Sequence, residues 1–264
     1  MPAAHADRPA VSKRSLAFVA IAVLTVAAFV ILLSLGTWQL NRLKWKEGLI
    51  AAAQERPLME PVAAPGQSSW PSFEIDDWNY RRVSLEGRFG EEEVHAWIVL
   101  NDANGPHAGA GYFVVAPFTT DDGWTVLVNR GFVPEEQKGQ ESRPQSAPPA
   151  GDVTIEGLIR RDDPPSLFTP SPNGRTRTWF TRHISTIANH FGLQRALVAP
   201  YTIDLVAEET PSGGLPQAGE SRVTFRNSHL QYALTWYGLA ASLVGVVAVG
   251  VWSRRQRRSA EPPT

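Results

Sequence analysis

Two stretches of this chain carry no aspartate, glutamate, lysine or arginine, and one lies near each end. They run from Ser15 to Asn41 and from Asn227 to Ser253, and each is 27 residues long. About 20 apolar residues, rising 1.5 Å each, cross the roughly 30 Å hydrocarbon core of a bilayer. We therefore expect a membrane protein, in which two transmembrane helices form a hairpin and hold a water-exposed domain between them.

The first apolar run predicts a retained anchor rather than a cleaved signal peptide. From Leu16 to Leu35 it exceeds the roughly 7–15 residues of a signal-peptide core, and no small-x-small cleavage site follows it. After Arg42 the sequence continues in good helix formers until Pro57. Helix one is therefore expected to extend to about residue 56.

Basic residues near the helix ends predict the orientation. The tails, residues 1–14 and 254–264, hold seven lysines and arginines, whereas the inner flanks of the two helices hold five. The positive-inside rule then places both termini in the cytoplasm. In a bacterium the domain, residues 57–226, would be periplasmic and its anchors would lie in the inner membrane.

The composition of the central region excludes several function classes. Residues 42–226 carry 24 acidic and 18 basic side chains, a net charge of −6, which argues against nucleic acid as a partner. The absence of cysteine excludes disulfides, thiolate metal sites and a cysteine nucleophile. No hydrolase elbow, phosphate-binding loop, dinucleotide fingerprint or zinc-binding helix is present. Glu91–Glu93 and Asp121–Asp122 occupy predicted turns, where solvation is expected.

Alternating hydrophobicity in the central region predicts a mainly antiparallel β (α+β) domain, either barrel-like or a curled sheet. One helix is expected within it, at Ser185–Leu193, and residues 134–151, with four prolines, are interpreted as an exposed, poorly ordered excursion. The predicted strands are Tyr80–Phe89, Val94–Leu100, Gly111–Phe118, Trp124–Asn129, Val153–Arg160, Thr176–Phe180 and Tyr201–Val206.

One histidine differs from the others. His95 is expected to be half exposed in a strand, and His183 and His190 are too far apart along a helix to share a metal. His229 instead begins the second apolar helix, on a helical face with Tyr232 and Trp236. That face is either an aromatic belt at the membrane boundary or a ligand site, because imidazole is a common axial ligand of haem iron.

The end of the first helix carries a complementary stripe, with Trp38, Arg42 and Trp45 at helical spacing. In an antiparallel hairpin this end lies at the same depth as the start of helix two, which allows Trp38 to face His229. Arg42 would then sit above them, where a guanidinium pairs with carboxylates such as haem propionates. The alternative is an ordinary set of anchors that extend to the interface.

Four blocks of residues follow one another along the chain. They are Leu35-Gly36-x-Trp38-Gln39-x-x-Arg42; Tyr80-Arg81-Arg82-Val83-x-Leu85-x-Gly87-x-Phe89; Gly111-Tyr112 to Pro117-Phe118 with Val126 to Pro134; and Asn227-x-His229-Leu230-Gln231-Tyr232-Ala233-x-Thr235-Trp236. In this order the blocks resemble the Surfeit locus 1 family, membrane proteins that assist cytochrome c oxidase assembly. Phe132 departs from the family pattern, since tryptophan is usual there.

The resemblance implies a non-enzymatic role in the maturation of oxidase subunit I, with haem a bound or handed over. The family histidine falls on His229, expected as the axial ligand of the haem iron, with Trp38, Arg42, Tyr232 and Trp236 around the cofactor. Subunit I and haem a synthase are the implied partners, beside the lipid bilayer.

The sequence also allows two other functions. One is a cofactor-free scaffold or chaperone that docks subunit I. Another is a tethered periplasmic enzyme, for which no nucleophile and base are found. Asn129 and Arg130 either serve the function or form, with Gly131, a turn at a strand end in which Arg130 pairs with a carboxylate of the domain.

Overall fold

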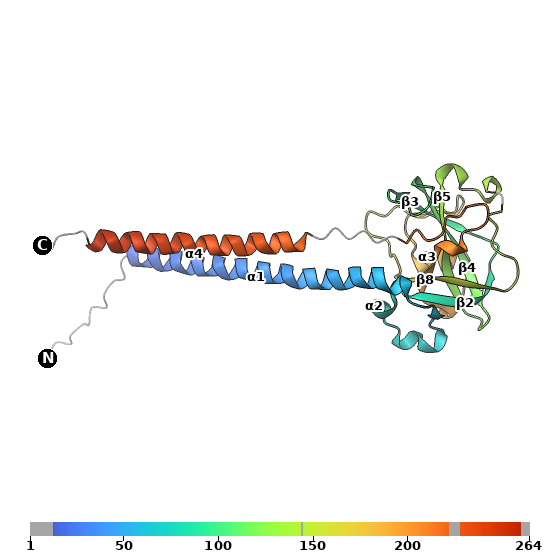
Figure 1. The fold of residues 1–264 in the computed structure, drawn as a ribbon, viewed down its shortest axis with the longest axis horizontal. Coiled ribbons are helices and arrows are strands. Elements are labelled where there is room, and N and C mark those ends of the chain that lie inside the picture. The colour runs from blue at the N-terminus through green and yellow to red at the C-terminus, as the bar shows by residue number, and fades with distance from the viewer. Residues whose placement is uncertain (1–12, 144, 222–227, 260–264) are drawn as a thin grey trace, which may run out of the picture. The chain divides into compact units, whose positions relative to one another are not determined.

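The computed structural model describes residues 13–143, 145–221 and 228–259. It divides into two units, one holding the two long helices and the other a β domain from Ile50 to Thr224. Figure 1 shows the elements of both units in order along the chain.

The long helices are α1, Lys13–Glu55, and α4, His229–Ser259. Both are long and apolar enough to cross a membrane, judged by length and composition, with mean hydropathies of 3.0 and 1.8 over their most apolar windows. Helix α1 ends at Glu55, where helix one was expected to extend to about residue 56. The expected start of helix two at residue 227 lies outside the described residues, and the described helix begins at His229.

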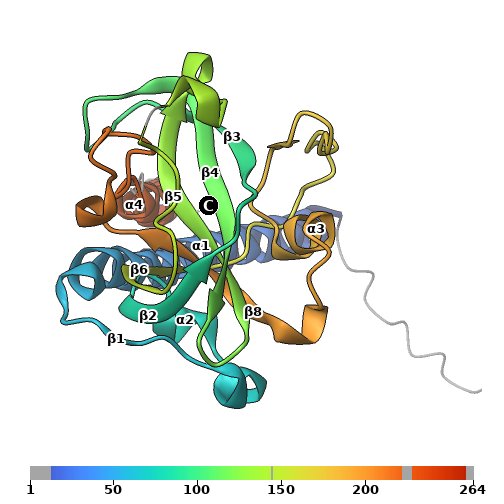
Figure 2. The ribbon, with the colours of Figure 1, turned by 90° about the vertical axis from the view of Figure 1, so that its right-hand side faces the viewer.

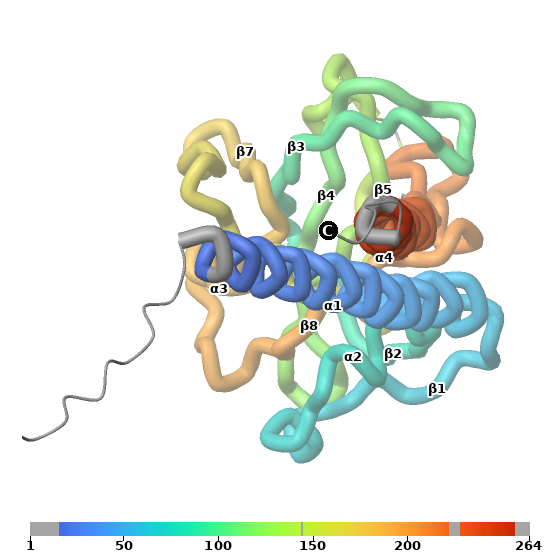
Figure 3. Tube along the Cα trace, turned by 90° about the vertical axis from the view of Figure 1, so that its left-hand side faces the viewer, coloured from blue at the N-terminus to red at the C-terminus, as the bar shows by residue number. Residues whose placement is uncertain are grey.

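Contacts between α1 and α4 follow a stripe that repeats every three and four residues, the spacing of paired helices. Ala233 and Ala240 of α4 are only 1% and 2% exposed, and Gly36 of α1 is buried. Such small residues let two backbones approach closely. The less exposed α1 positions on this stripe are Thr25, Phe29, Leu32, Gly36, Gln39, Leu43 and Lys46. Figure 3 shows the two helices side by side.

The β domain contains a closed barrel (Figure 2). Strands β2, β6, β8, β5 and β4 follow one another as paired neighbours, and β2 also pairs with β4, which closes the ring. Pairing is antiparallel except for β1–β2, β3–β7 and β5–β8, so the mainly antiparallel, barrel-like prediction is confirmed. The strands are β1 Val62–Ala63, β2 Arg82–Phe89, β3 Val94–Leu100, β4 Gly109–Thr120, β5 Thr125–Pro134, β6 Val153–Arg160, β7 Thr178–Trp179 and β8 Val198–Leu205.

The barrel is filled by alternate side chains of its strands, as the two-residue period of a strand requires. Tyr201 belongs to this core and is fully buried, and its hydroxyl donates to the carbonyl oxygen of Pro65 at 2.6 Å. A second apolar cluster lies beneath α3, Ile184–His190, and includes Leu127 and Trp179. Strand β5 therefore has buried side chains on both faces, and its residues from Thr125 to Val133 are all buried.

Short helices make the remaining connections. They are α2 Ile75–Trp78, η1 Arg56–Leu58, η2 Gln67–Ser72, η3 Glu135–Gln137, η4 Gln140–Ser142, η5 Arg195–Leu197 and η6 Ala207–Glu209. The prediction that residues 134–151 form an exposed, poorly ordered excursion is wrong at Arg143 and Ser146, which are buried. The reason is electrostatic, because Arg143 reaches a carboxylate of the barrel.

Candidate functional site

The imidazole of His229 contacts α1 through Gln39. Nδ1 of His229 lies 2.7 Å from Oε1 of Gln39. An amide oxygen only accepts, so Nδ1 donates this hydrogen bond, and in the neutral form of the ring the lone pair is then on Nε2. A metal-binding histidine is commonly held in this way, with its other nitrogen donating to an acceptor that fixes the tautomer. The donor set therefore fits an iron ligand.

A second contact between the helices involves Tyr237. Its hydroxyl lies 3.0 Å from Oγ1 of Thr37, and its ring lies over Gly36. A Cβ at position 36 would stand 2.8 Å from two ring carbons, closer than van der Waals contact allows. Gln39, Thr37 and Tyr237 were not predicted as site residues. They could have been found from the sequence, because polar side chains and a glycine within a charge-free helix indicate a contact with another helix.

The five predicted site residues are not all brought together. His229 and Trp236 lie on the stripe of α4 that faces α1, and both are partly buried. Trp38 and Tyr232 are 56% and 53% exposed. Arg42 lies 3.7 Å above the ring of Trp45, measured from its guanidinium carbon to the ring centroid. Gln39, one residue after Trp38, is the α1 side chain that meets the imidazole.

Replacing Gly36 with leucine is expected to separate α1 from α4, because the ring of Tyr237 occupies the space that a side chain needs. The chain has no cysteine, so a cysteine pair at Gln39 and His229 reports this contact without background. Cross-linking yield should fall several-fold with Gly36→Leu. It should be unchanged with Gly238→Leu, where no atom lies within 4 Å of an added Cβ. Equal yields in both variants would contradict the packing.

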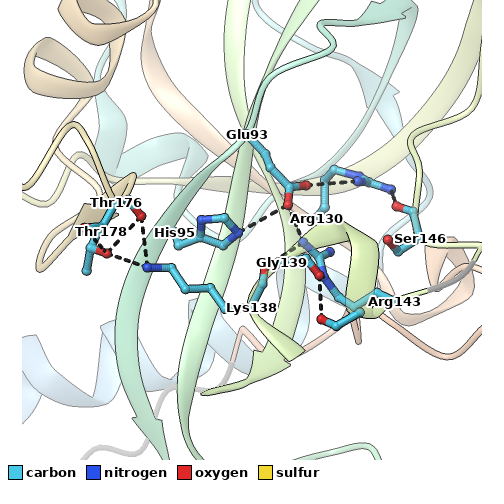
Figure 4. A network of polar contacts seen from close by, with 10 residues as sticks. Glu93, His95, Arg130, Lys138, Gly139, Arg143, Ser146, Thr176 and Thr178 are labelled. Atoms are coloured by element: carbon cyan, nitrogen blue, oxygen red, sulfur yellow. Dashed lines mark hydrogen bonds and ion pairs between the residues drawn. The ribbon is translucent and has the colours of Figure 1, made fainter. Parts of the chain in front are cut away.

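The β domain holds a buried charge cluster centred on Glu93 (Figure 4). The Glu93 carboxylate accepts from Arg143, lies 3.2 Å from Nε2 of His95 and faces Arg130 at 3.7 Å. Arg130 also donates to the carbonyl oxygen of Ser146 at 2.8 Å. Glu93 was predicted to be solvated and His95 half exposed. Both predictions are wrong, because both side chains are buried, and Glu93 pairs with Arg143, 50 residues further along the chain.

Burial and charge oppose each other in this cluster. Burial raises the pKa of Glu93, but its hydrogen bond with His95 and the charge of Arg143 outweigh burial and hold the pKa below its usual value. Burial lowers the pKa of Arg130 to about 10, against the attraction of Glu93. Two guanidinium groups thus share one carboxylate.

Asp204 forms a second cluster of the same kind. It accepts from Arg182 at 2.5 Å, from Asn129 at 3.1 Å and from the hydroxyl of Ser221, and Nε of Arg160 lies 3.5 Å away. Burial raises the pKa of Asp204, but the charges of Arg182 and Arg160 outweigh burial, so the pKa is lowered overall. The turn expected at Asn129 and Arg130 is wrong, since both residues lie within β5. The pairing of Arg130 with a domain carboxylate, expected along with that turn, is confirmed.

Across the part of the chain that the structure describes, no three His, Cys, Asp or Glu side chains converge as a metal site. A haem iron needs only one imidazole from this chain. Among the predicted site residues, the only histidine is His229, and its ring contacts Gln39.

Two long apolar helices, one before and one after a small closed barrel along the sequence, define the class of this protein, a barrel domain flanked in sequence by two candidate membrane spans. The model of the SURF1 family matches residues 26–241. Surfeit locus protein 1 of Homo sapiens is 36% identical over 220 residues, covering 79% of this chain and 70% of that protein. A SURF1-like protein of Monosiga brevicollis is 34% identical over 236 residues, covering 86% and 85%. The chain belongs to the SURF1 family, as its four blocks predicted.

Proposed function

We propose that this chain is a cytochrome c oxidase assembly factor that holds haem a and hands it over for the maturation of oxidase subunit I. Membership of the SURF1 family supports the general role. The observation that carries the cofactor proposal is the pairing of His229 with Gln39, because it orients an imidazole as iron ligands are oriented. The proposed role is not enzymatic.

The proposed setting is the inner membrane of a bacterium. α1 and α4 would cross it as a two-helix transmembrane hairpin, supported by their length, their hydropathy and the contacts between them. The arginines that close the C-terminal helix support cytoplasmic termini and a periplasmic barrel.

In the proposed site, His229 would ligate the haem iron, and Gln39 would hold its ring in place. Trp236, on the same face, and the exposed rings of Trp38 and Tyr232 would pack on the porphyrin. Arg42 would turn from the ring of Trp45 to meet the propionates. Exposed aromatic rings suit a cofactor that is released again, because a site open laterally toward lipid lets the haem pass to a partner protein.

A cofactor-free scaffold is the second candidate. The observation that favours it is the same exposure of Trp38 and Tyr232, since bare aromatic rings on a helix pair also suit docking against a transmembrane helix of subunit I or of haem a synthase. Protein purified from cells that make haem a would be coloured in the first case and colourless in the second.

The test is the absorbance spectrum of His229→Ala, purified in detergent with haem a supplied. We expect the haem band to be lost, because the iron ligand is removed. Gln39→Leu should weaken binding by about 10–100-fold, the usual cost of losing the partner of a ligating histidine. His107→Ala, in the β domain, is the matched control and should keep the band. An unchanged band in His229→Ala would remove this residue from the site.

A further inference from the structure

A pocket in the β domain is not used by the proposed haem site. Its volume is about 330 Å³, within the range of small-molecule sites. It lies against the end of β3, and its charged residues come from β6, from β8 and from the connecting segments. Its lining consists of Ile98, Val99, Leu100, Asn101, Asp102, Phe113, Arg160, Arg182, Asp204, Glu220 and Ser221.

Two arginines at this pocket share a single carboxylate. Arg160 and Arg182 both pair with Asp204, which also accepts from Asn129 and Ser221. Arg160 lies 4.0 Å over the ring of Tyr80, yet its Nε and Nη1 make no hydrogen bond among the described residues. Asp204 cannot neutralise both cations, so this part of the pocket keeps an excess positive charge.

The rest of the lining is of two kinds. Ile98, Val99, Leu100 and Phe113 give the pocket an apolar wall. Asp102 and Glu220 add negative charge, although both oxygens of Glu220 already accept hydrogen bonds from backbone N–H groups of Asn104 and Gly105 and from the Gln217 amide. A dianion such as phosphate would be repelled by these two carboxylates and would leave the apolar wall uncovered. A monoanion with an apolar body satisfies both parts.

We propose that this pocket binds a carboxylate carried on a small apolar body, either a short-chain organic acid or the C-terminal residue of an apolar peptide. The carboxylate would lie at Arg160 and Arg182, where a guanidinium donates two parallel hydrogen bonds. Its apolar body would lie against β3. The proposal is independent of haem, because every lining residue belongs to the β domain.

Calorimetric titration of the full-length protein in detergent tests the proposal, with protein-free micelles as the blank. The probes are hexanoate and N-acetyl-leucine, with hexanamide, N-acetyl-leucinamide and inorganic phosphate beside them. At least one carboxylate should bind, its amide and phosphate should bind at least tenfold more weakly, and Arg182→Gln should weaken the carboxylate at least tenfold. Arg177→Gln, which removes an exposed arginine paired with Glu92, is the matched control and should change nothing.

The two probes separate the sources, since binding of hexanoate alone indicates a small acid and binding of N-acetyl-leucine alone indicates a peptide end. A second variant guards against misfolding of Arg182→Gln. Val99→Asp places a negative charge at an exposed wall position and leaves the Asp204 cluster intact, and it should also weaken the carboxylate about tenfold. Equal binding of acid and amide, no binding of either acid, or full affinity in both folded variants would overturn the proposal.

Discussion

Replacing Glu93 with glutamine is expected to lower the free energy of unfolding of the β domain by about 3–5 kcal/mol, the usual cost of removing one partner from a buried ion pair. The substitution keeps the size of the side chain but removes the anion that faces Arg143 and Arg130. Both guanidinium groups are buried, so water cannot replace the lost charge. Urea unfolding of the full-length protein in detergent, followed by amide hydrogen exchange in β4 and β5, measures the change.

The adjacent residue provides the control. Glu92 pairs with Arg177 at 3.0 Å, but both side chains are exposed, so Glu92→Gln should leave the stability nearly unchanged. Equal losses in the two variants would show that the buried cluster has no special role.

The effect of Glu93→Gln should also depend on pH. The folded-state pKa of Glu93 is lowered, so its carboxylate stabilises the domain fully above the unfolded value of about 4.3. That contribution is lost as the pH falls through the lower folded value. The difference between wild type and Glu93→Gln should therefore be largest near neutral pH and shrink below about pH 4. A difference that is constant with pH would exclude the charge as its cause.

Much of the barrel could be predicted from sequence because its strands alternate. The bounds of β3 and β6 agree with the prediction, since each has a clear pattern of apolar residues ended by polar or turn residues. Strand β5 proved longer than predicted, because Asn129 and Arg130 looked like a strand end. Their polar side chains are instead buried against Asp204 and Glu93, which no local pattern reveals.

The helix contacts were harder to predict than the helices themselves. Trp38, Arg42 and Trp45 repeat at helical spacing, but so do Gly36, Gln39 and Leu43. Both stripes fit a paired helix, and its aromatic residues favoured the first stripe as the predicted site. Packing follows the second, because small residues at Gly36, Ala233 and Ala240 permit close approach.

The buried arginines could not be located from sequence for a different reason. A cluster such as Glu91–Glu93 beside a turn is usually solvated, and only Glu93 of the three turns inward. Its partners, Arg130 and Arg143, lie in distant parts of the chain. Long-range pairing of this kind depends on strand order, which the sequence alone did not specify.

The tripeptide Asn129-Arg130-Gly131 explains how these parts are held together. The pairing of β4 with β5 shifts here, so that Val115 faces Asn129 while Val114 faces Gly131, and Arg130 is the extra residue of a bulge. A bulge redirects side chains, which lets Arg130 reach Glu93 while Asn129 reaches Asp204. Gly131 follows with a φ of +133°, and the backbone of residues 217–218 packs directly against it.

Gly131→Ala is therefore expected to cost about 3 kcal/mol or more, because it combines two penalties. A Cβ at this position would overlap the backbone of Gln217 and Ala218, and an L residue rarely adopts this φ. The overlap would displace the two 2.8 Å hydrogen bonds between the backbones of Phe132 and Gln217. Because Glu220 and Ser221 follow Gln217, the Asp204 pocket should loosen as well. Urea unfolding and hydrogen exchange of Phe132 measure both effects.

Gly151→Ala separates the two penalties. Gly151 also has a positive φ, +82°, but no atom lies within 4 Å of an added Cβ, so this variant carries only the backbone cost of about 1–2 kcal/mol. Gly131→Ala should exceed it by about 1–3 kcal/mol, the typical cost of overpacking. Only Gly131→Ala should expose the Phe132 amide to exchange. If the two variants lose equal stability, then the close approach of residues 217–218 does not hold this segment on the barrel.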